Sequence, residues 1–167
     1  MKQLMRKLEV LWIATILTAC LWVVGQAQEP TTHDKKSLRL ATAKRIVEAA
    51  AKKAFEIKVP MVIAVVDESG ILMLLERMEG APLISVDVAQ NKAYTAAAVR
   101  MPTHKVSEII QPGKPAFGFH TMPRIAPFGG GFPIGADDKV VGGIGVSGGS
   151  AVQDMECAQA GLAVLKE

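Results

Sequence analysis

The chain has 167 residues, of which 50% are hydrophobic, and its 19 Lys and Arg against 16 Asp and Glu give a net charge of +3. This length fits one domain, and the apolar content excludes a chain that is disordered throughout. The basic residues do not form the clustered face that nucleic-acid binding requires, so we expect no nucleic-acid partner.

Residues 1–27 are predicted to be a secretory signal peptide. Lys2, Arg6 and Lys7 precede a mostly apolar run from Val10 to Val24, and the small residues at 25–27 offer a cleavage site. The apolar run is about 15 residues long, which is shorter than the roughly 20 residues that span a bilayer. We therefore expect no membrane span and a periplasmic or secreted protein.

A second processing route is open at Cys20. The sequence Leu17-Thr18-Ala19-Cys20 resembles a bacterial lipobox, in which the cysteine is lipidated and becomes the first mature residue. The apolar residues that follow Cys20 favour simple cleavage over this lipid anchor. Residues 28–36 then form a flexible lead-in to a single domain over residues 37–167. Cys157 would be the only cysteine left, and we expect it to be a small core residue.

The domain is predicted to begin with a helix and a β-hairpin. The helix runs from Ser37 or Leu40 to Glu56, with an apolar stripe on one face. The apolar run 61–67 is a strand buried on both sides, and a turn that ends at Gly70 leads into a return strand over 71–78. The strands of a hairpin with so short a loop are antiparallel.

Two helices and an irregular segment follow. An alanine-rich helix over 85–100 is expected to lie close to its neighbour, and Thr103 caps a short helix that ends at Ile109 or Ile110. Residues 111–138 hold five prolines, His120 and four of the five phenylalanines, with one or two short strands. A loop of this length in a compact domain is usually functional or disordered, and its aromatic content argues against disorder.

The last elements are a glycine-rich strand over 139–149 and a helix over 151–165. Ser150 and Gln153 form a capping box at the start of that helix. Residues 143–148 also match Gly-x-Gly-x-x-Gly, but the chain reaches Glu167 without the second strand and acidic residue that dinucleotide binding needs. The glycines therefore predict close helix–strand packing. The element order predicts an α+β fold: two-layer, with a mainly antiparallel sheet flanked by helices.

The irregular segment carries the candidate site. His120 and Met122 are both side chains that ligate haem iron. Phenylalanines supply an apolar wall, and consecutive glycines let backbone approach a ligand closely. The predicted site adds Phe128, Gly129, Gly130, Gly131, Phe132 and Lys92. The alternative is that His120 is a hydrogen-bonded loop residue and the phenylalanines are core.

For the other polar residues, a structural role is weighed against a functional one. Lys92 and Arg100 are candidates for receiving the acidic group of a ligand, although on a helix such residues are more often surface charges. His104 is interpreted as an exposed residue of a helix's first turn. Asp67 is interpreted as a turn residue and Tyr94 as a packing residue.

The run from Val59 to Leu165 resembles the GlcG/HbpS haem-binding family, also seen as the C-terminal domain of PduO-type proteins. The matching motifs include residues 63–70, 76–81, 87–98, 127–131 and 141–149. The resemblance implies an antiparallel sheet flanked by helices, similar to profilin-like or PAS-like domains. It also implies homo-oligomers and, for some members, secretion and haem binding.

Three functions remain open from the sequence. The first is an exported protein that binds haem or a similar tetrapyrrole non-covalently, with His120 as the iron ligand. The second is a metal-free enzyme, such as a lyase acting on an aromatic or hydroxy acid, in which Lys92 or Arg100 holds the acid and Asp67 or Tyr94 transfers protons. The third is a structural oligomer without a pocket beneath the phenylalanines.

Overall fold

The computed structural model describes residues 35–166, and the chain from Lys36 onward forms one compact unit. The predicted signal peptide, the lipobox at Cys20 and most of the lead-in lie outside the described residues, so they remain predictions. Within residues 35–166, no helix combines the length and apolar character needed to cross a bilayer.

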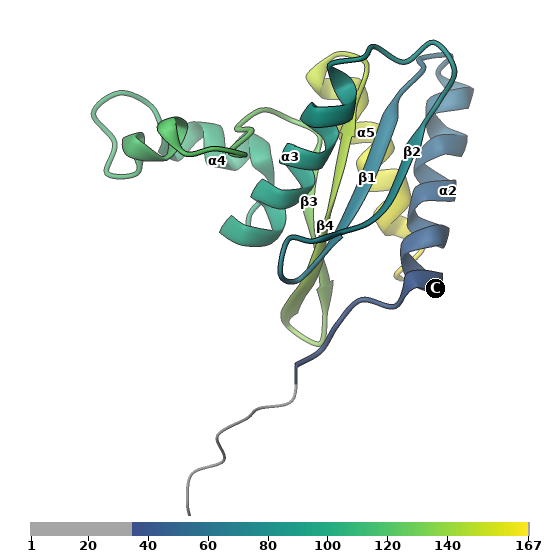
Figure 1. Cartoon of the computed structure of the whole chain (residues 1–167), viewed down its shortest axis with the longest axis horizontal. Helices are drawn as coiled ribbons and strands as arrows, with labels where there is room; N and C mark the ends of the chain where they lie inside the picture. The colour runs from purple at the N-terminus through teal and green to yellow at the C-terminus, as the bar shows by residue number, and fades with distance from the viewer. Residues whose placement is uncertain (1–34, 167) are drawn as a thin grey trace, which may run out of the picture. The chain divides into compact units, whose positions relative to one another are not determined.

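The unit is built around a four-stranded sheet whose strands lie in the order β2-β1-β4-β3 (Figure 1). Every neighbouring pair is antiparallel. The elements are α2 (Leu40–Glu56), β1 (Val62–Asp67), β2 (Leu72–Arg77), α3 (Ser85–Val99), α4 (Thr103–Ile109), the 3₁₀ helix η1 (Phe117–Thr121), β3 (Gly131–Ala136), β4 (Lys139–Ser147) and α5 (Ala151–Ala163).

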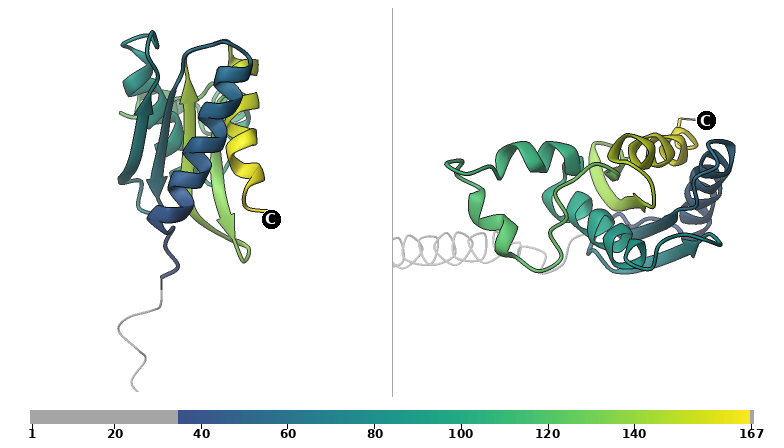
Figure 2. Two further views of the ribbon diagram at one scale, coloured as in Figure 1. Left: turned by 90° about the vertical axis from the view of Figure 1, so that its right-hand side faces the viewer. Right: turned by 90° about the horizontal axis from the view of Figure 1, so that it is seen from above.

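Helices cover both faces of the sheet. Helices α2 and α5 pack side by side on one face, and α3 covers the other (Figure 2). The α+β class and the antiparallel sheet flanked by helices are confirmed. The expectation of two layers is wrong, because α3 covers the second face of the sheet and so adds a third layer.

Strand β1 shows why both faces need cover. Ile63 and Val65 belong to the core beneath α2 and α5, whereas Val62 and Val66 belong to the core beneath α3. All four side chains are completely buried. The prediction of a strand buried on both sides is therefore confirmed, and it places the sheet in the middle of the unit.

The glycines of β4 allow α3 to approach the sheet closely. A Cβ added at Gly145 would lie 2.0 Å from the Ala89 carbonyl oxygen, and one added at Gly143 would lie 2.2 Å from that of Ala93. No side chain fits at such distances. The Gly-x-Gly-x-x-Gly spacing thus serves helix–strand packing, as the sequence predicts.

The predicted turn between β1 and β2 is also present. Asp67 Oδ1 accepts hydrogen bonds from the backbone N–H groups of Ser69 and Ile71 at 2.8 and 2.9 Å, and Gly70 has a φ of +77°. At the other hairpin, Asp137 and Asp138 both have positive φ, as a tight two-residue turn requires. The Ser150–Gln153 capping box at α5 is confirmed.

Residues 103–128, here called the arm, project away from the sheet (Figures 1 and 2). The arm contains α4, η1 and the loops around them. Its two ends meet, because the Thr103 hydroxyl donates to the Phe128 carbonyl oxygen at 2.8 Å. The sequence predicted Thr103 as the cap of α4, and this is wrong. Pro102 holds the cap position, and no side chain within residues 35–166 caps the helix.

Candidate functional site

A buried ion pair lies beneath the base of the arm. Lys92 Nζ donates to Asp154 Oδ2 at 2.7 Å and to the Val146 carbonyl oxygen at 2.9 Å. The two charged side chains are 1% and 4% exposed. Asp154 also accepts a hydrogen bond from the Gly149 N–H at 3.0 Å. The pair thus joins α3, β4 and α5.

The interpretation of Lys92 as a surface charge is wrong, since its ammonium group is buried and bonded internally. Burial lowers the pKa of Lys92, and the hydrogen bond and charge of Asp154 offset part of that effect. The Lys92 side chain is therefore hardly accessible to a ligand, and a ligand-binding role for it remains a prediction.

The three consecutive glycines pack against this pair. A Cβ at Gly130, where φ is +117°, would lie 2.9 Å from Lys92 Nζ and 2.6 Å from the Val146 carbonyl oxygen. The Gly131 N–H donates to Thr103 Oγ1 at 2.9 Å, and the Gly130 carbonyl accepts from the Val146 N–H at 2.9 Å. The fold itself therefore needs the glycines here, and contact of Gly129, Gly130 or Gly131 with a ligand remains a prediction.

Phe128 and Phe132 flank the glycines but face different surroundings. Phe132 is 8% exposed and belongs to the main core, whereas Phe128 is 47% exposed. Lys92 Nζ lies 5.1 Å from the centre of the Phe128 ring, within reach of a cation–π contact. Phe128 therefore covers the ion pair with one face of its ring and remains accessible to a ligand.

The tip of the arm presents an imidazole among exposed apolar side chains. The His120 ring centroid lies 4.3 Å from that of Phe117, and His120 Nδ1 is hydrogen-bonded to the Phe117 carbonyl oxygen. Phe117, Phe119 and Met122 are 41%, 39% and 52% exposed. The predicted His120 and Met122 thus lie together on η1 and just after it.

The hydrogen bond of His120 decides which of its nitrogens is available. A carbonyl oxygen only accepts, so Nδ1 carries the proton and the lone pair of neutral imidazole is on Nε2. A hydrogen bond on one ring nitrogen is how proteins orient histidines that ligate metals through the other. The donor set at the tip therefore fits haem, with one imidazole for iron and aromatic rings for the porphyrin. No group of three or more His, Cys, Asp or Glu that would hold a bare metal ion occurs within residues 35–166.

His104 differs from its expected exposed position. Its ring lies 5.8 Å from that of Phe132, and its Nδ1 is buried and has no hydrogen-bond partner among residues 35–166. The sequence places His104 in the first turn of α4 but gives no sign that the core aromatic Phe132 lies against it.

Tyr94 is a packing residue, as the sequence predicts, and its ring lies against Gly70 in the β1–β2 turn. The Arg124 guanidinium lies 3.9 Å from the centre of the Tyr94 ring, and Arg124 donates to the Gly70 carbonyl oxygen at 3.4 Å. Sequence reasoning missed Arg124, because the arm brings it to a turn 54 residues earlier in the chain.

Two cavities lie away from these residues. One, of about 440 Å³, lies between the approach to α2 and the β3–β4 hairpin. The other, of about 570 Å³, is lined by Ala54, Phe55, Lys58, Val59, Pro60, Met78 and Glu79. Neither is lined by a residue of the arm, and several apolar side chains at the tip of the arm are exposed on one copy of the chain.

The fold and the site define a small α+β domain with a four-stranded antiparallel sheet and a projecting aromatic arm that bears one histidine at its tip. Residues 38–163 match the family model described as "Haem degrading protein HbpS-like". The chain belongs to this HbpS-like family, and the resemblance seen in the sequence is confirmed.

Individual relatives agree with this family. The chain is 41% identical over 133 residues to an uncharacterized 15.0 kDa protein of Citrobacter freundii, covering 78% of this chain and 94% of that protein. The crystal structure of protein ORFY of Klebsiella pneumoniae has a TM-score of 0.80 at 35% identity, covering 84% of this chain and 98% of that one. A PduOC:heme complex has a TM-score of 0.73 at 36% identity, covering 77% and 94% of the two chains.

Proposed function

We propose that this protein binds haem non-covalently through the tip of the arm. The observation that carries the proposal is the accessible imidazole of His120, whose Nδ1–H is held by the Phe117 carbonyl while its Nε2 lone pair remains available. The proposal is supported by the PduOC:heme complex, a relative at 36% identity. Haem supplies an iron and a flat apolar ring, and both match the groups displayed here.

The residues at the tip of the arm contact different parts of the haem. His120 holds the iron, and Phe117, Phe119 and Met122 contact the porphyrin with side chains that are exposed without it. Covering these side chains removes apolar surface from water, which favours binding by about 25 cal/mol for each Å² buried. Because these side chains are exposed on one copy, we propose that a second copy covers the other side of the haem in a homo-oligomer.

We also propose that the protein is exported, on the strength of its N-terminal sequence. The basic residues, the apolar run and the small residues at 25–27 support secretion to the periplasm or beyond. Fractionation of cells and mass spectrometry of the mature N-terminus test this. A mature chain that begins at a lipidated Cys20 would replace simple cleavage with the lipid anchor.

Haem titration tests the binding proposal. The solved ORFY chain, 98% of which this chain covers, consists of this unit alone, so the chain from Gln28 onward is a sound sample. Adding hemin to it should give a saturable Soret shift at micromolar concentration. His120→Ala should change the position and intensity of the band, and Phe55→Ala, which removes an exposed ring on α2, should not.

The same titration distinguishes failure of the haem-binding proposal from failure of the iron-ligand assignment alone. The absence of any Soret change at micromolar hemin would remove the function. An unaltered spectrum in His120→Ala would remove only the iron ligand. Loss of the Soret band over time with a reductant present would indicate haem degradation, as in the description of the family. A stable band would indicate that the protein carries haem without degrading it.

A metal-free enzyme is the second candidate, and one contact favours it. Tyr94 lies beside the turn of Asp67, with the Arg124 guanidinium over its ring. These three residues offer a proton donor, a carboxylate and an anion partner, whereas Lys92 is buried. A thermal-shift screen of aromatic and hydroxy acids tests this site, and stabilisation that survives both Tyr94→Phe and Arg124→Gln would count against it.

A further inference from the structure

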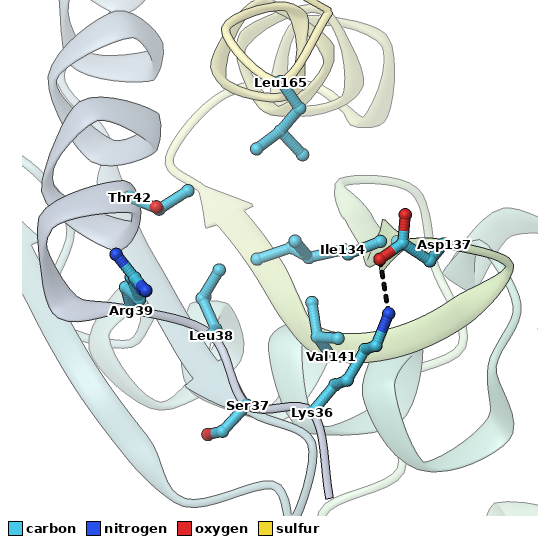
Figure 3. A pocket seen from close by; sticks show the side chains of 11 residues that line it. Lys36, Ser37, Leu38, Arg39, Thr42, Ile134, Asp137, Val141 and Leu165 are labelled. Carbon is cyan, nitrogen blue, oxygen red and sulfur yellow. Dashed lines mark hydrogen bonds and ion pairs between the residues drawn. The ribbon is translucent and has the colours of Figure 1, made fainter.

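The cavity of about 440 Å³ lies on the side of the sheet that faces α2 and α5 and shares no residue with the arm. It is an open cavity, bordered by the approach to α2, the β3–β4 hairpin and Leu165, just after the end of α5 (Figure 3). This volume falls within the range of roughly 300 to 1,000 Å³ that is typical of small-molecule pockets.

The floor of the cavity is apolar and already part of the core. Ile134, Val141 and Leu38 are 0%, 4% and 8% exposed and belong to the main hydrophobic cluster. Leu165 is 38% exposed and points into the space from the opposite wall (Figure 3). An apolar group that enters would therefore contact side chains that are rigidly packed from behind.

The rim of the cavity is polar, and most of its charge is neutralised. Lys36 and Asp137 form an ion pair at the mouth, drawn as a dashed line in Figure 3. Lys36 lowers the pKa of Asp137 through this hydrogen bond and its charge, so the Asp137 carboxylate stays ionised at neutral pH. The Ser37 hydroxyl donates to Glu68 at 2.9 Å. These three side chains are therefore committed to other partners.

Arg39 and Thr42 form the remaining polar wall. Neither side chain has a hydrogen-bond or ion-pair partner among residues 35–166, and both line the cavity. The guanidinium of Arg39 is thus the one uncompensated charge among the described lining residues, and its fork of donors matches a carboxylate. The Thr42 hydroxyl adds a further donor on the same side.

We propose that this cavity binds a small monocarboxylic acid with a compact apolar body. The carboxylate pairs with Arg39 and accepts a hydrogen bond from Thr42, and the hydrocarbon lies against Leu38, Ile134 and Val141. Leu165 closes over it. The net positive lining selects an acid over an amine, and the buried floor selects an apolar body over a sugar or a phosphate. This site is independent of haem binding at the arm.

Methyl-detected NMR with benzoate as the probe tests this proposal on the labelled chain from Gln28 onward. We expect saturable shifts of the Leu38, Ile134, Val141 and Leu165 methyls, with a Kd of about 1 mM for a ligand of this size. Benzamide, which has the same ring without the charge, should bind at least about tenfold more weakly because it forms no ion pair.

Variants locate the site. Arg39→Gln should weaken benzoate binding at least about tenfold, because it removes the exposed guanidinium that pairs with the carboxylate. Lys44→Gln, a matched change on the exposed face of α2, should leave it unchanged. Leu165→Trp should block binding by filling the cavity from its rim, and His120→Ala should have no effect.

Three results would overturn the proposal. They are no methyl shifts up to about 10 mM benzoate, the weak limit for such a ligand, equal binding of benzamide, or full affinity in Arg39→Gln. Loss of benzoate binding in His120→Ala would place the acid at the arm instead.

Discussion

Lys92 Nζ and Asp154 Oδ2 lie 2.7 Å apart, and this contact joins helices on opposite faces of the sheet. Lys92 belongs to α3 and Asp154 to the first turn of α5. Both charges are shielded from water, and further hydrogen bonds to the Val146 carbonyl and from the Gly149 N–H satisfy them. The arm begins and ends beside this pair, so the pair fixes the base on which the candidate haem site stands.

Removal of one partner should be far more costly than the pair's own net contribution. In Lys92→Met the Asp154 carboxylate remains buried without its counter-charge, and we expect a loss of about 3–5 kcal/mol in the free energy of unfolding. Urea denaturation measures it. A double variant, Lys92→Met with Asp154→Leu, should recover part of the loss because no charge is then left unpaired.

An exposed ion pair provides the control. Lys105 and Glu108 are 53% and 60% exposed and lie one turn apart on α4. Lys105→Met should cost less than about 0.5 kcal/mol. If both lysine variants lose the same stability, burial is not what makes the Lys92 contact important.

The regular elements were predictable because their signals are local. The turn at Asp67 to Gly70 and the capping box at Ser150 each depend on residues within a few positions of one another, and the structure contains both. The close approach of α3 to β4 was also predictable, since alanines on a helix and glycines on a strand have few other uses.

The base of the arm was not predictable, because its contacts join distant positions. The partners of Lys92 are 54 and 62 residues away, and Thr103 binds residues 25 and 28 positions later. A lysine on a helix appears solvated when only its neighbours in the sequence are considered. A threonine before a short helix likewise appears to be its cap, although tertiary hydrogen bonds take its hydroxyl.

The contact between Gly145 and α3 gives a second prediction. In Gly145→Ala the new Cβ would lie 2.0 Å from the Ala89 carbonyl oxygen and 2.5 Å from the Ala93 nitrogen, so α3 must move away from the sheet. We expect a loss of at least about 3 kcal/mol or failure to fold. Thermal unfolding followed by circular dichroism measures it.

A glycine with open space around it is the matched control. A methyl group added at Gly118 in η1 would have no atom within 4 Å, and Gly118 lacks a positive φ. Gly118→Ala should therefore change stability by less than about 1 kcal/mol, and a small gain would reflect a less flexible unfolded chain. A Gly145→Ala protein with native stability would show that the helix–strand distance is not limiting.

The thiol of Cys157 gives the last prediction, on reactivity and pH. Cys157 is completely buried, and burial, together with the nearby charges of Glu156 and Asp154, raises its pKa from 9.0 to about 11. The folded state therefore keeps this proton between pH 9 and 11, whereas the unfolded state releases it. The contribution of Cys157 to stability is full below pH 9 and is lost as the pH rises to 11. A comparison of wild type with Cys157→Ala isolates this contribution, because the other titrating groups cancel.

At pH 8 a thiol reagent should label the folded protein only at the rate of unfolding and the urea-unfolded protein at once. Rapid labelling of the folded state would show that the thiol is accessible.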